Sequence, residues 1–298
     1  MEVTRQGFYN YLENLNKPSK YQALIDEIKK IIAEDECNDT YGRKRMYEAL
    51  KLKESESESG FPKVPSEATV RKIMLAEGLI HKPKRNPKGL TKADKAAQKS
   101  DNLIKNNGVI DGKKQSDFEA DKPCEKTVGD ITELPTADGK LYISILADCF
   151  DTGILGLSMA NHMRATLARD TVKMAVCLHP ELRNNDAISH TDRGSQYTSE
   201  LYRNFLEKYG LRQSMNSAAG RCHDNAKCES IFARFKEELI YGRYDTSKMP
   251  MEAVKQLVWR YFMGYWNNRR ICSANGGLPP MVKRKRYYET RETAQIAA

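Results

Sequence analysis

The chain has 298 residues, 40% of them hydrophobic, and a formal net charge of +9. It is long enough to bury a sizeable core in two domains. The absence from the sequence of any apolar run of about 18 residues, and of an apolar N-terminal segment, argues against a membrane or secreted protein and predicts a cytoplasmic one. Its seven scattered cysteines form no CxxC pair, so neither a disulfide framework nor a zinc site is favoured.

The positive charge is concentrated in two stretches. Residues 82–99 carry a net charge of +6 and residues 260–291 carry +7, so the rest of the chain is mildly acidic. Two basic stretches around an acidic body favour a polyanion held at two places, with an affinity that falls as salt rises. Solvated loops and tails would give the same pattern, so charge alone leaves both interpretations open.

Three short helices are predicted near the N-terminus. Apolar residues recur at helical spacing in residues 20–33 and 41–53, and a third helix should begin at the N-cap Ser66 and stop at Gly78. The polar run of residues 54–60 is expected to be a loop, because it contains no apolar residue before Phe-Pro.

The third helix should expose Arg71 and Lys72, as the recognition helix of a DNA-binding unit does. We therefore predict a small all-α, helix-turn-helix-like DNA-binding domain over residues 1–80. Such three-helix units also occur as plain packing modules. Residues 81–125, rich in Lys, Asn, Asp and Gly with little periodicity, are predicted to be a basic linker.

After the linker the pattern changes to strands. Alternation predicts an antiparallel meander of strands at 127–134, 141–149 and 154–159. There follow a helix at 166–178, a strand at 187–191, a helix at 199–209, a strand at 211–215, and helices near 226–241 and 250–267. This order predicts a mixed α/β sheet covered on both faces, with a core over residues 126–270 and a basic C-terminal tail over 271–298.

Three carboxylates occupy positions where such a fold presents ligands. Asp130 lies in the middle of the first core strand, where a buried charge needs a partner or a metal. Asp192 follows a short strand and enters a glycine turn. Glu229 lies one turn into a helix with Lys236 on the same face. Oxygen ligands of this kind suit Mg²⁺ or Mn²⁺, and two such ions promote phosphodiester chemistry.

Position alone does not establish this site, because forty acidic residues offer many triples. Without further context, Asp130 is a hydrogen-bonded core residue, Asp192 a turn former and Glu229 an early-helix acid favoured by the helix dipole. Asp148 and Asp151, near another strand end, are alternatives to Asp130.

Two other groups of residues suggest sites less strongly. Cys222, His223 and Cys228 lack a second pair of zinc ligands, so loop and helix positions are favoured. The aromatic residues of 259–266 could stack on bases, but their helical spacing favours a place in the core.

Three sequence motifs supply the missing context. They are Gly129-Asp-Ile-Thr-Glu133, His190-Thr-Asp-Arg-Gly-Ser-Gln-Tyr-Thr-Ser199 and Asp224-Asn-Ala-Lys-Cys-Glu-Ser-Ile-Phe-Ala-Arg-Phe-Lys-Glu-Glu238. In that order they closely resemble the retroviral-integrase-type core of bacterial insertion-sequence transposases, and more narrowly the OrfB product of insertion-sequence family three. The resemblance extends to Tyr265-Trp-Asn-Asn-Arg-Arg270 and covers nearly the whole chain.

The resemblance implies an RNase H-like fold and a DDE triad, matched by Asp130, Asp192 and Glu229, that binds Mg²⁺ or Mn²⁺. Such enzymes nick a transposon end and use its 3′-hydroxyl to attack DNA, without a covalent protein–DNA intermediate. The residues then expected to contact DNA are Lys236, Asn225, Arg193 and Gln196 in the core, Arg71 and Lys72 on the third helix, and Lys84 and Arg85 in the linker. His190 and Gly194 would help to shape the loop around Asp192.

The implied partners are double-stranded DNA, as terminal inverted repeats and as target, and further copies of the chain. The family also implies an upstream OrfA segment, joined by a translational frameshift, and no membrane partner. Two other functions remain open: a catalytically idle DNA-binding regulator, and a nuclease of the same fold that cuts without joining. All three carboxylates are present, which argues against the idle regulator, although the segment between Asp192 and Glu229 is one residue longer than is usual in the family.

Overall fold

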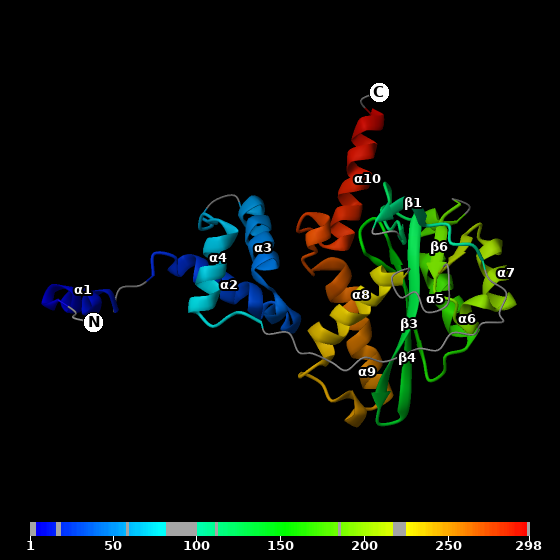
Figure 1. Cartoon of the computed structure of the whole chain (residues 1–298), viewed down its shortest axis with the longest axis horizontal. Coiled ribbons are helices and arrows are strands. Elements are labelled where there is room, and N and C mark those ends of the chain that lie inside the picture. Colours follow the sequence, from blue (N-terminus) through cyan, green and yellow to red (C-terminus); the bar gives the residue numbers. More distant parts are fainter. Residues whose placement is uncertain are drawn as a thin grey trace. The chain divides into compact units, whose positions relative to one another are not determined.

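A computed structural model of the chain describes residues 4–15, 19–57, 60–81, 100–110, 113–183, 186–216 and 225–296. The chain divides into two compact units, Met1–Lys82 and Pro83–Ala298, which are described separately below (Figure 1). Among the described residues, no helix is both long and apolar enough to span a membrane.

The N-terminal unit is helical. Its elements are α1 (Arg5–Leu15), α2 (Gln22–Ala33), the 3₁₀ turn η1 (Glu36–Thr40), α3 (Arg43–Glu56) and α4 (Glu67–Ala76). The apolar faces of α2, α3 and α4 meet in a core that includes Leu24, Ile28, Met46, Leu50, Val70 and Met74. The three helices expected from apolar spacing are therefore present, while α1 was not predicted from the sequence.

The ends of these helices follow from their sequence. Ser66 caps α4 by accepting a hydrogen bond from the backbone N–H of Thr69, and Gly78 ends that segment with a φ of +68°. Helix α3 runs into the polar segment predicted as a loop, and Glu54 there accepts a hydrogen bond from the backbone N–H of Val64. This contact ties the end of α3 to the approach of α4.

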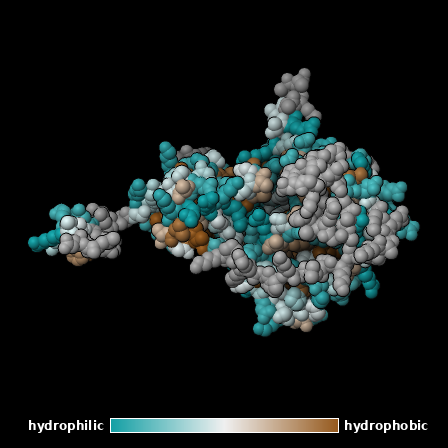
Figure 2. Space-filling model, in the orientation of Figure 1, coloured by the Kyte–Doolittle hydropathy of each residue, from teal (hydrophilic) through white to brown (hydrophobic). Residues whose placement is uncertain are grey.

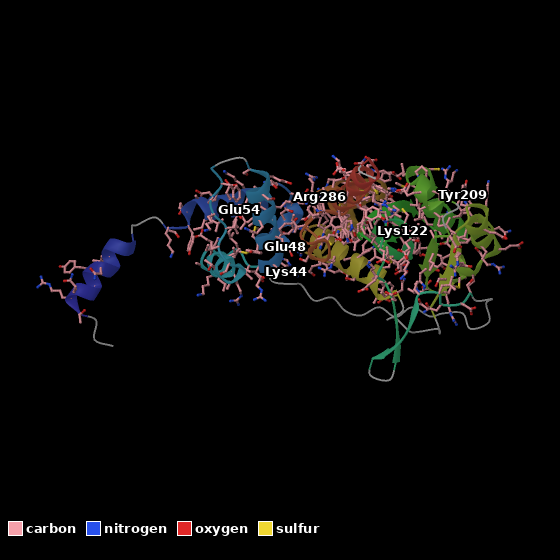
Figure 3. The ribbon with its side chains drawn as sticks, turned by 90° about the horizontal axis from the view of Figure 1, so that it is seen from above. Lys44, Glu48, Glu54, Lys122, Tyr209 and Arg286 are labelled. Carbon is pink, nitrogen blue, oxygen red and sulfur yellow. The ribbon has the colours of Figure 1, made fainter. Side chains whose placement is uncertain are left out.

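The surface of the N-terminal unit is mixed in character. Lys44, Glu48 and Glu54 on α3 bring both signs of charge to it (Figure 3). Hydrophobic side chains also gather over this unit on the face shown in Figure 2, and Leu75 on α4 is 49% exposed. The segments joining α2 to α3 and α3 to α4 are longer than the turn of three or four residues in a typical helix-turn-helix.

The second unit is built on a five-stranded mixed sheet. Its strands are β3 (Lys126–Thr136), β4 (Gly139–Asp148), β5 (Ile154–Ala160), β6 (Ile188–Thr191) and β7 (Arg212–Met215), in the order β5-β4-β3-β6-β7. Neighbours within β5-β4-β3 are antiparallel, and β6 and β7 continue the sheet in parallel with β3. The sheet and the helical unit before it confirm the predicted fold class, an RNase H-like α/β core preceded by a small all-α unit.

Helices cover both faces of this sheet. In Figure 1 it stands between α8 (Ala226–Phe235) and α9 (Met251–Trp259) on one side and α5 (Ala165–Leu178), α6 (Ser195–Thr198) and α7 (Glu200–Lys208) on the other. Gly156 allows α5 to approach β5 closely, because a Cβ atom there would lie 2.2 Å from the carbonyl oxygen of Thr171. Short 3₁₀ turns η2 (Pro180–Leu182), η5 (Thr246–Lys248) and η7 (Ser273–Asn275) join these elements.

Two helices continue directly into π-helical turns. Helix α8 runs into η4 (Lys236–Ile240), and α9 runs into η6 (Arg260–Trp266). Aromatic rings join the two: Phe235 lies with its ring centroid 4.9 Å from Phe262 and 5.3 Å from Tyr261. Tyr261, Phe262, Tyr265 and Trp266 are buried, as core residues, whereas Trp259 is 48% exposed.

The segment predicted as a linker contains a hairpin. Strands β1 (Lys105–Ile110) and β2 (Lys113–Ser116) pair with each other in an antiparallel sheet of their own. Residues 82–99 of the same segment, with Lys84 and Arg85, lie outside the described residues.

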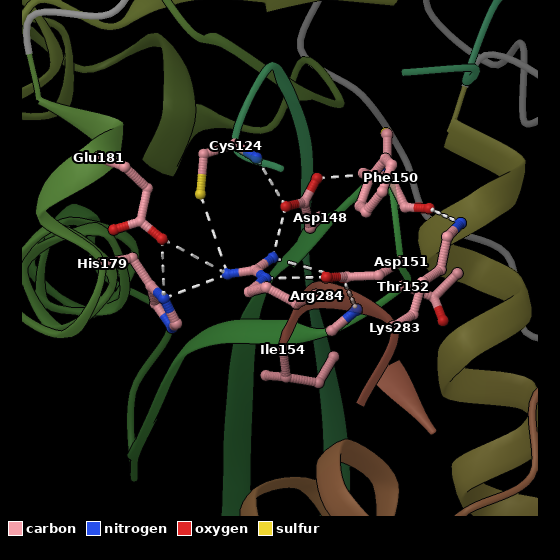
Figure 4. A network of polar contacts seen from close by, with 12 residues as sticks. Cys124, Asp148, Phe150, Asp151, Thr152, Ile154, His179, Glu181, Lys283 and Arg284 are labelled. Carbon is pink, nitrogen blue, oxygen red and sulfur yellow. Dashed lines mark hydrogen bonds and ion pairs between the residues drawn. The ribbon is translucent and has the colours of Figure 1, made fainter. Parts of the chain in front are cut away.

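The segment predicted as a basic tail forms the helix α10 (Pro280–Ile296), whose start is anchored in the core. Arg284 is buried and donates hydrogen bonds to the carboxylates of Asp148 and Asp151, with Nε 2.8 Å from Oδ2 of Asp151 (Figure 4). Its Nη1 also lies 3.1 Å from Nδ1 of His179. Asp148 and Asp151, the alternatives to Asp130, are therefore occupied by a structural arginine.

The turn between β4 and β5 is held by side chains from the C-terminal part of the chain. Lys283 and Asn275 donate to the carbonyls of Phe150 and Asp151, and Trp266 Nε1 donates to that of Thr152. Asn267 makes two hydrogen bonds with the backbone of Ile154. Trp266 and Asn267 thus hold the C-terminal helices against the sheet. Both belong to the motif Tyr265–Arg270, which carried part of the family resemblance.

Candidate active site

Asp130 lies at the centre of the candidate site. It occupies the middle of β3, opposite Ile145 of β4, and its Oδ1 accepts a hydrogen bond of 2.8 Å from the backbone N–H of Ile131. Burial, together with the negative charges of Asp192 and Glu229, raises the pKa of the Asp130 carboxyl to about 8. The carboxyl is therefore in a place that disfavours a bare negative charge.

The pairing of β3 with β6 leads toward Asp192. Val128 of β3 pairs with His190 of the parallel strand β6, and Asp130 and Asp192 each follow two residues later in the sequence. Asp192 follows the end of β6 and accepts a hydrogen bond of 2.9 Å from the backbone N–H of Gly194. Burial raises the pKa of the Asp192 carboxyl, and that hydrogen bond opposes the rise.

Glu229 approaches from the first turn of α8, where its side chain is exposed. Two contacts fix the start of this helix. The side-chain amide of Asn225 donates to the carbonyl of Gly129, and Lys227 Nζ donates to the carbonyl of Cys149. Because its charge raises the pKa of Asp130, Glu229 belongs to the same electrostatic neighbourhood.

The three carboxylates do not converge to single-ion distance. Among the described residues, no group of three His, Cys, Asp or Glu side chains is placed to hold one metal ion. The donor set nevertheless fits a divalent cation, because it is all oxygen and the like charges of Asp192 and Glu229 act on Asp130. Asn225 adds a further oxygen, since its buried Oδ1 has no hydrogen-bond partner.

Lys236 places a cation beside these acids. It opens the π turn η4, one element after the helix that carries Glu229. Burial lowers the pKa of the Lys236 ammonium, while Glu133 and Asp130 favour its charged form. That Glu229 and Lys236 lie on the same face of the helix stays a prediction.

The loop after β6 is held from β7. His190 is buried, with Nδ1 2.8 Å from Ser214 Oγ and Nε2 3.0 Å from Asn216 Oδ1. Arg193 is half-buried, and its Nε donates to the carbonyl of Asn216. These contacts fix the segment that presents Asp192.

The residues expected to contact DNA differ in accessibility. Arg71 and Lys72 are exposed on α4 of the N-terminal unit. Gln196 and Asn225 are buried at 7% and 2% exposure, so contact with DNA would require a change of conformation there. Cys222 and His223, of the suggested zinc group, lie outside the described residues, and Cys228 is a buried free thiol.

Sequence reasoning did not single out Tyr197. Its side chain is buried, its hydroxyl has no hydrogen-bond partner, and burial followed by the charges of Asp130 and Asp192 raises its pKa. Tyr197 lies within the motif His190–Ser199, which could have indicated a place near the site. Its proximity to Asp130 and Asp192 depends on the turn into α6, which the sequence does not show.

The contacts that hold α8 were also not predicted. Lys227 was an ordinary helix position in the sequence, and the pairing of Glu238 with Arg270 joins residues 32 positions apart. The two residues of the second contact end sequence motifs singled out for their resemblance, Asp224–Glu238 and Tyr265–Arg270, but nothing in either motif showed that they pair.

Comparison with known proteins identifies the family. The family described as "Integrase core domain" matches residues 120–222. Transposase InsF for insertion sequence IS3A of Escherichia coli (strain K12) is 32% identical over 282 residues, which cover 94% of this chain and 90% of that protein. The putative transposase InsK for insertion sequence element IS150 of the same strain is 29% identical over 292 residues, covering 97% and 93%.

Solved structures with similar folds are more distant. The HTLV-2 integrase catalytic core domain in complex with magnesium aligns with a TM-score of 0.43 and 16% identity, covering 56% of this chain and 99% of that one. The catalytic domain of Mos1 mariner transposase aligns with a TM-score of 0.38 and 16% identity, covering 47% and 71%.

Proposed function

Because the chain belongs to the IS3-type insertion-sequence transposases with an integrase core, we propose that Asp130, Asp192 and Glu229 are its catalytic carboxylates. The chain is a polynucleotidyl transferase of the DDE type, and on this proposal these three side chains hold its divalent ions. The observation that carries the assignment is the pairing of Val128 with His190, each of which lies two residues before one of the two aspartates, Asp130 and Asp192. The effect of Glu229 on the pKa of Asp130 supports including the third carboxylate.

The site residues would divide the work as follows. Asp130, Asp192 and Glu229 supply oxygen ligands for Mg²⁺ or Mn²⁺, and the buried Asn225 Oδ1 is a further acceptor at the start of α8. Two bound divalent ions would supply charge neutralisation at the attacking and leaving oxygens of the phosphodiester. Lys236 and Arg193 place positive charge where a DNA backbone reaching these acids would pass.

DNA would be held outside the acid cluster as well. We propose that the unit of residues 1–80 binds the terminal inverted repeats through the exposed Arg71 and Lys72 on α4. Lys84 and Arg85 would add phosphate contacts. The working assembly would contain several copies of the chain on DNA in the cytoplasm, together with an OrfA-type segment from an upstream frame.

The experiment that tests the catalytic assignment uses the gene with its native flanking DNA and upstream frame on a donor plasmid. Circles containing the junction of the transposon ends are measured for wild type and for Glu229→Gln, which keeps size and removes charge. Circles from wild type alone support the assignment. Circles from both would exclude Glu229 as a catalytic carboxylate. Circles from neither, with end binding intact, would favour a catalytically idle regulator, and cut ends without circles would favour a nuclease.

A further inference from the structure

A buried ion pair lies where the helix that carries Glu229 ends. Glu238 is 1% exposed and Arg270 is 4% exposed. Arg270 Nε donates to Glu238 Oε2 at 2.8 Å, and its Nη2 donates to Oε1 at 2.6 Å, which is a two-pronged contact. The hydroxyl of Tyr261 also donates to Oε2, at 2.9 Å. Both carboxylate oxygens are therefore used.

The arginine of this pair is held in place independently. Its guanidinium carbon lies 4.3 Å from the ring centroid of Trp266, in a cation–π contact. Trp266 is in turn fixed to the carbonyl of Thr152 in the β4–β5 turn. Arg270 thus links the end of the Glu229 helix to the edge of the sheet.

Glu238 lies inside the π turn η4, which begins at Lys236. In this turn the backbone N–H of Tyr241 bonds to the carbonyl of Lys236, five residues earlier, at 2.8 Å. A π turn is less favourable than continued α-helix and persists where surrounding contacts determine it. The two-pronged contact of Arg270 with Glu238 is such a determinant, and Arg243 Nε adds a bond to the carbonyl of Glu238.

The π turn begins at Lys236 itself. The backbone N–H of Lys236 still bonds to the carbonyl of Phe232, four residues earlier, as in α8, so the inserted residue changes the rotation of the residues after Lys236. Lys236 is half-buried, and burial lowers the pKa of its ammonium, while the charges of Glu133 and Asp130 act against burial by favouring the charged form. Phe235, packed on Tyr261 and Phe262, holds the preceding turn of α8 against η6.

We propose that Glu238 and Arg270 are positioning residues for strand transfer, which fix η4 so that Glu229 and Lys236 lie correctly against Asp130. This inference rests on the catalytic assignment proposed above. Neither residue touches DNA or metal in this role, since both are buried. They act through the backbone of η4 and the packing of α8.

The test compares the same substitution at two buried arginines. Arg270→Lys keeps the charge but loses the two-pronged contact with Glu238. Arg284→Lys is the matched control, because Arg284 is also buried and also bridges carboxylates, but it holds α10 and not η4. For each variant, thermal unfolding, end binding by mobility shift, and junction circles on the donor plasmid are measured at a temperature where the protein is folded.

Both variants should unfold at a lower temperature than the wild type and should still bind the transposon ends. Only Arg270→Lys should lose circles per bound protein, by about 10- to 100-fold, because small misplacements of reacting groups cost that much. If circles per bound protein for Arg270→Lys stay within about twofold of those for Arg284→Lys, a purely structural role is established and the proposal is wrong.

Tyr261→Phe decides the case if Arg270→Lys does not fold. It removes only the hydroxyl that donates to Glu238 and keeps the aromatic packing. Fewer circles with unchanged end binding support the proposal, and unchanged circles overturn it. Glu229→Gln is measured alongside: if it forms circles as wild type does, the catalytic assignment itself fails. If it forms none while Arg270→Lys and Tyr261→Phe match the control, only the positioning role fails.

Discussion

The side-chain amide of Asn225 donates to the main-chain carbonyl of Gly129 over 3.3 Å, which ties the start of α8 to the residue before Asp130. This contact joins the element that carries the third carboxylate to the strand that carries the first. Asn225 stands at the N-cap position of α8 but makes no side-chain capping hydrogen bond there. Its role is therefore to connect two elements, and the helix end does not depend on it for a cap.

Asn225→Ala should lower both the stability of the protein and its activity. Removing the buried amide leaves the Gly129 carbonyl without this donor and should cost about 1–3 kcal/mol of unfolding free energy, measured by urea titration. Junction circles should fall by about tenfold or more because Glu229 loses its fixed distance from Asp130. Ser230→Ala, on the exposed side of the same helix, is the control and should change neither quantity. Equal circle yields from both variants would contradict the connecting role.

The secondary structure of the core followed from local patterns. Alternating apolar residues predicted β3, β4 and β5, and the 3.6-residue period predicted α5, α7, α8 and α9, because a sheet between helix layers imposes those periods. The prediction that Asp192 follows a short strand was correct. The pairing of the two strands that precede Asp130 and Asp192 in register could not be predicted, because β3 and β6 lie about 60 residues apart in the sequence.

Features that depend on distant partners were not predictable in this way. The stretch Lys283–Arg286 looked like a solvated tail, because nothing local shows that Arg284 meets Asp148 and Asp151 more than 130 residues earlier. The π turns were likewise hidden, since a hydrogen bond five residues apart requires no distinctive composition. The contacts that hold Glu238 in η4 include the remote Arg270, 32 residues later.

Helix α10 should be needed for stability through the residues that contact the core, such as Arg284 and Tyr287, and not beyond Thr290. A chain ending after Leu278 leaves Asp148 and Asp151 buried without their guanidinium, which should cost about 3–5 kcal/mol of unfolding free energy. A chain ending after Thr290 keeps Arg284 and should unfold close to wild type. Urea titration of both truncations checks this. A similar loss of unfolding free energy in the two truncated chains would show that the stabilising contacts lie beyond residue 290.

Asp148 should give the wild type a distinctive dependence on pH. Burial and the nearby charge of Asp151 raise the pKa of the Asp148 carboxyl to about 6, although Arg284 opposes the rise. Its ordinary value in an unfolded chain is about 3.9, so the folded state binds this proton more tightly. The stabilising contribution of that proton is complete below about pH 4 and is lost as pH rises through about 6.

Asp148→Asn removes this titration. The unfolding free energy of the wild type, relative to the variant, should therefore rise by at most about 3 kcal/mol as pH falls from 7 to 4. Urea titrations of both proteins at several pH values in that range measure the difference. A constant difference would show that the carboxyl does not titrate there, and a difference of opposite slope would show that Arg284 lowers its pKa.

The exposed cations of α4 should account for part of the binding to transposon ends, and salt is the sharpest probe of that contribution. Each phosphate contact that is lost should reduce the slope of log affinity against log salt by about one, because one fewer counterion is released on binding. Arg71→Ala and Lys72→Ala should each lower end binding in this way, measured by mobility shift on a duplex of the native end. Arg43→Ala is the control, because Arg43 forms an ion pair with Glu67 at 3.0 Å.

If the α4 variants weaken binding to the native end but not to an unrelated duplex, these side chains read bases as well as phosphates. Unchanged slopes in both would remove α4 from the DNA interface and leave the N-terminal unit a packing module.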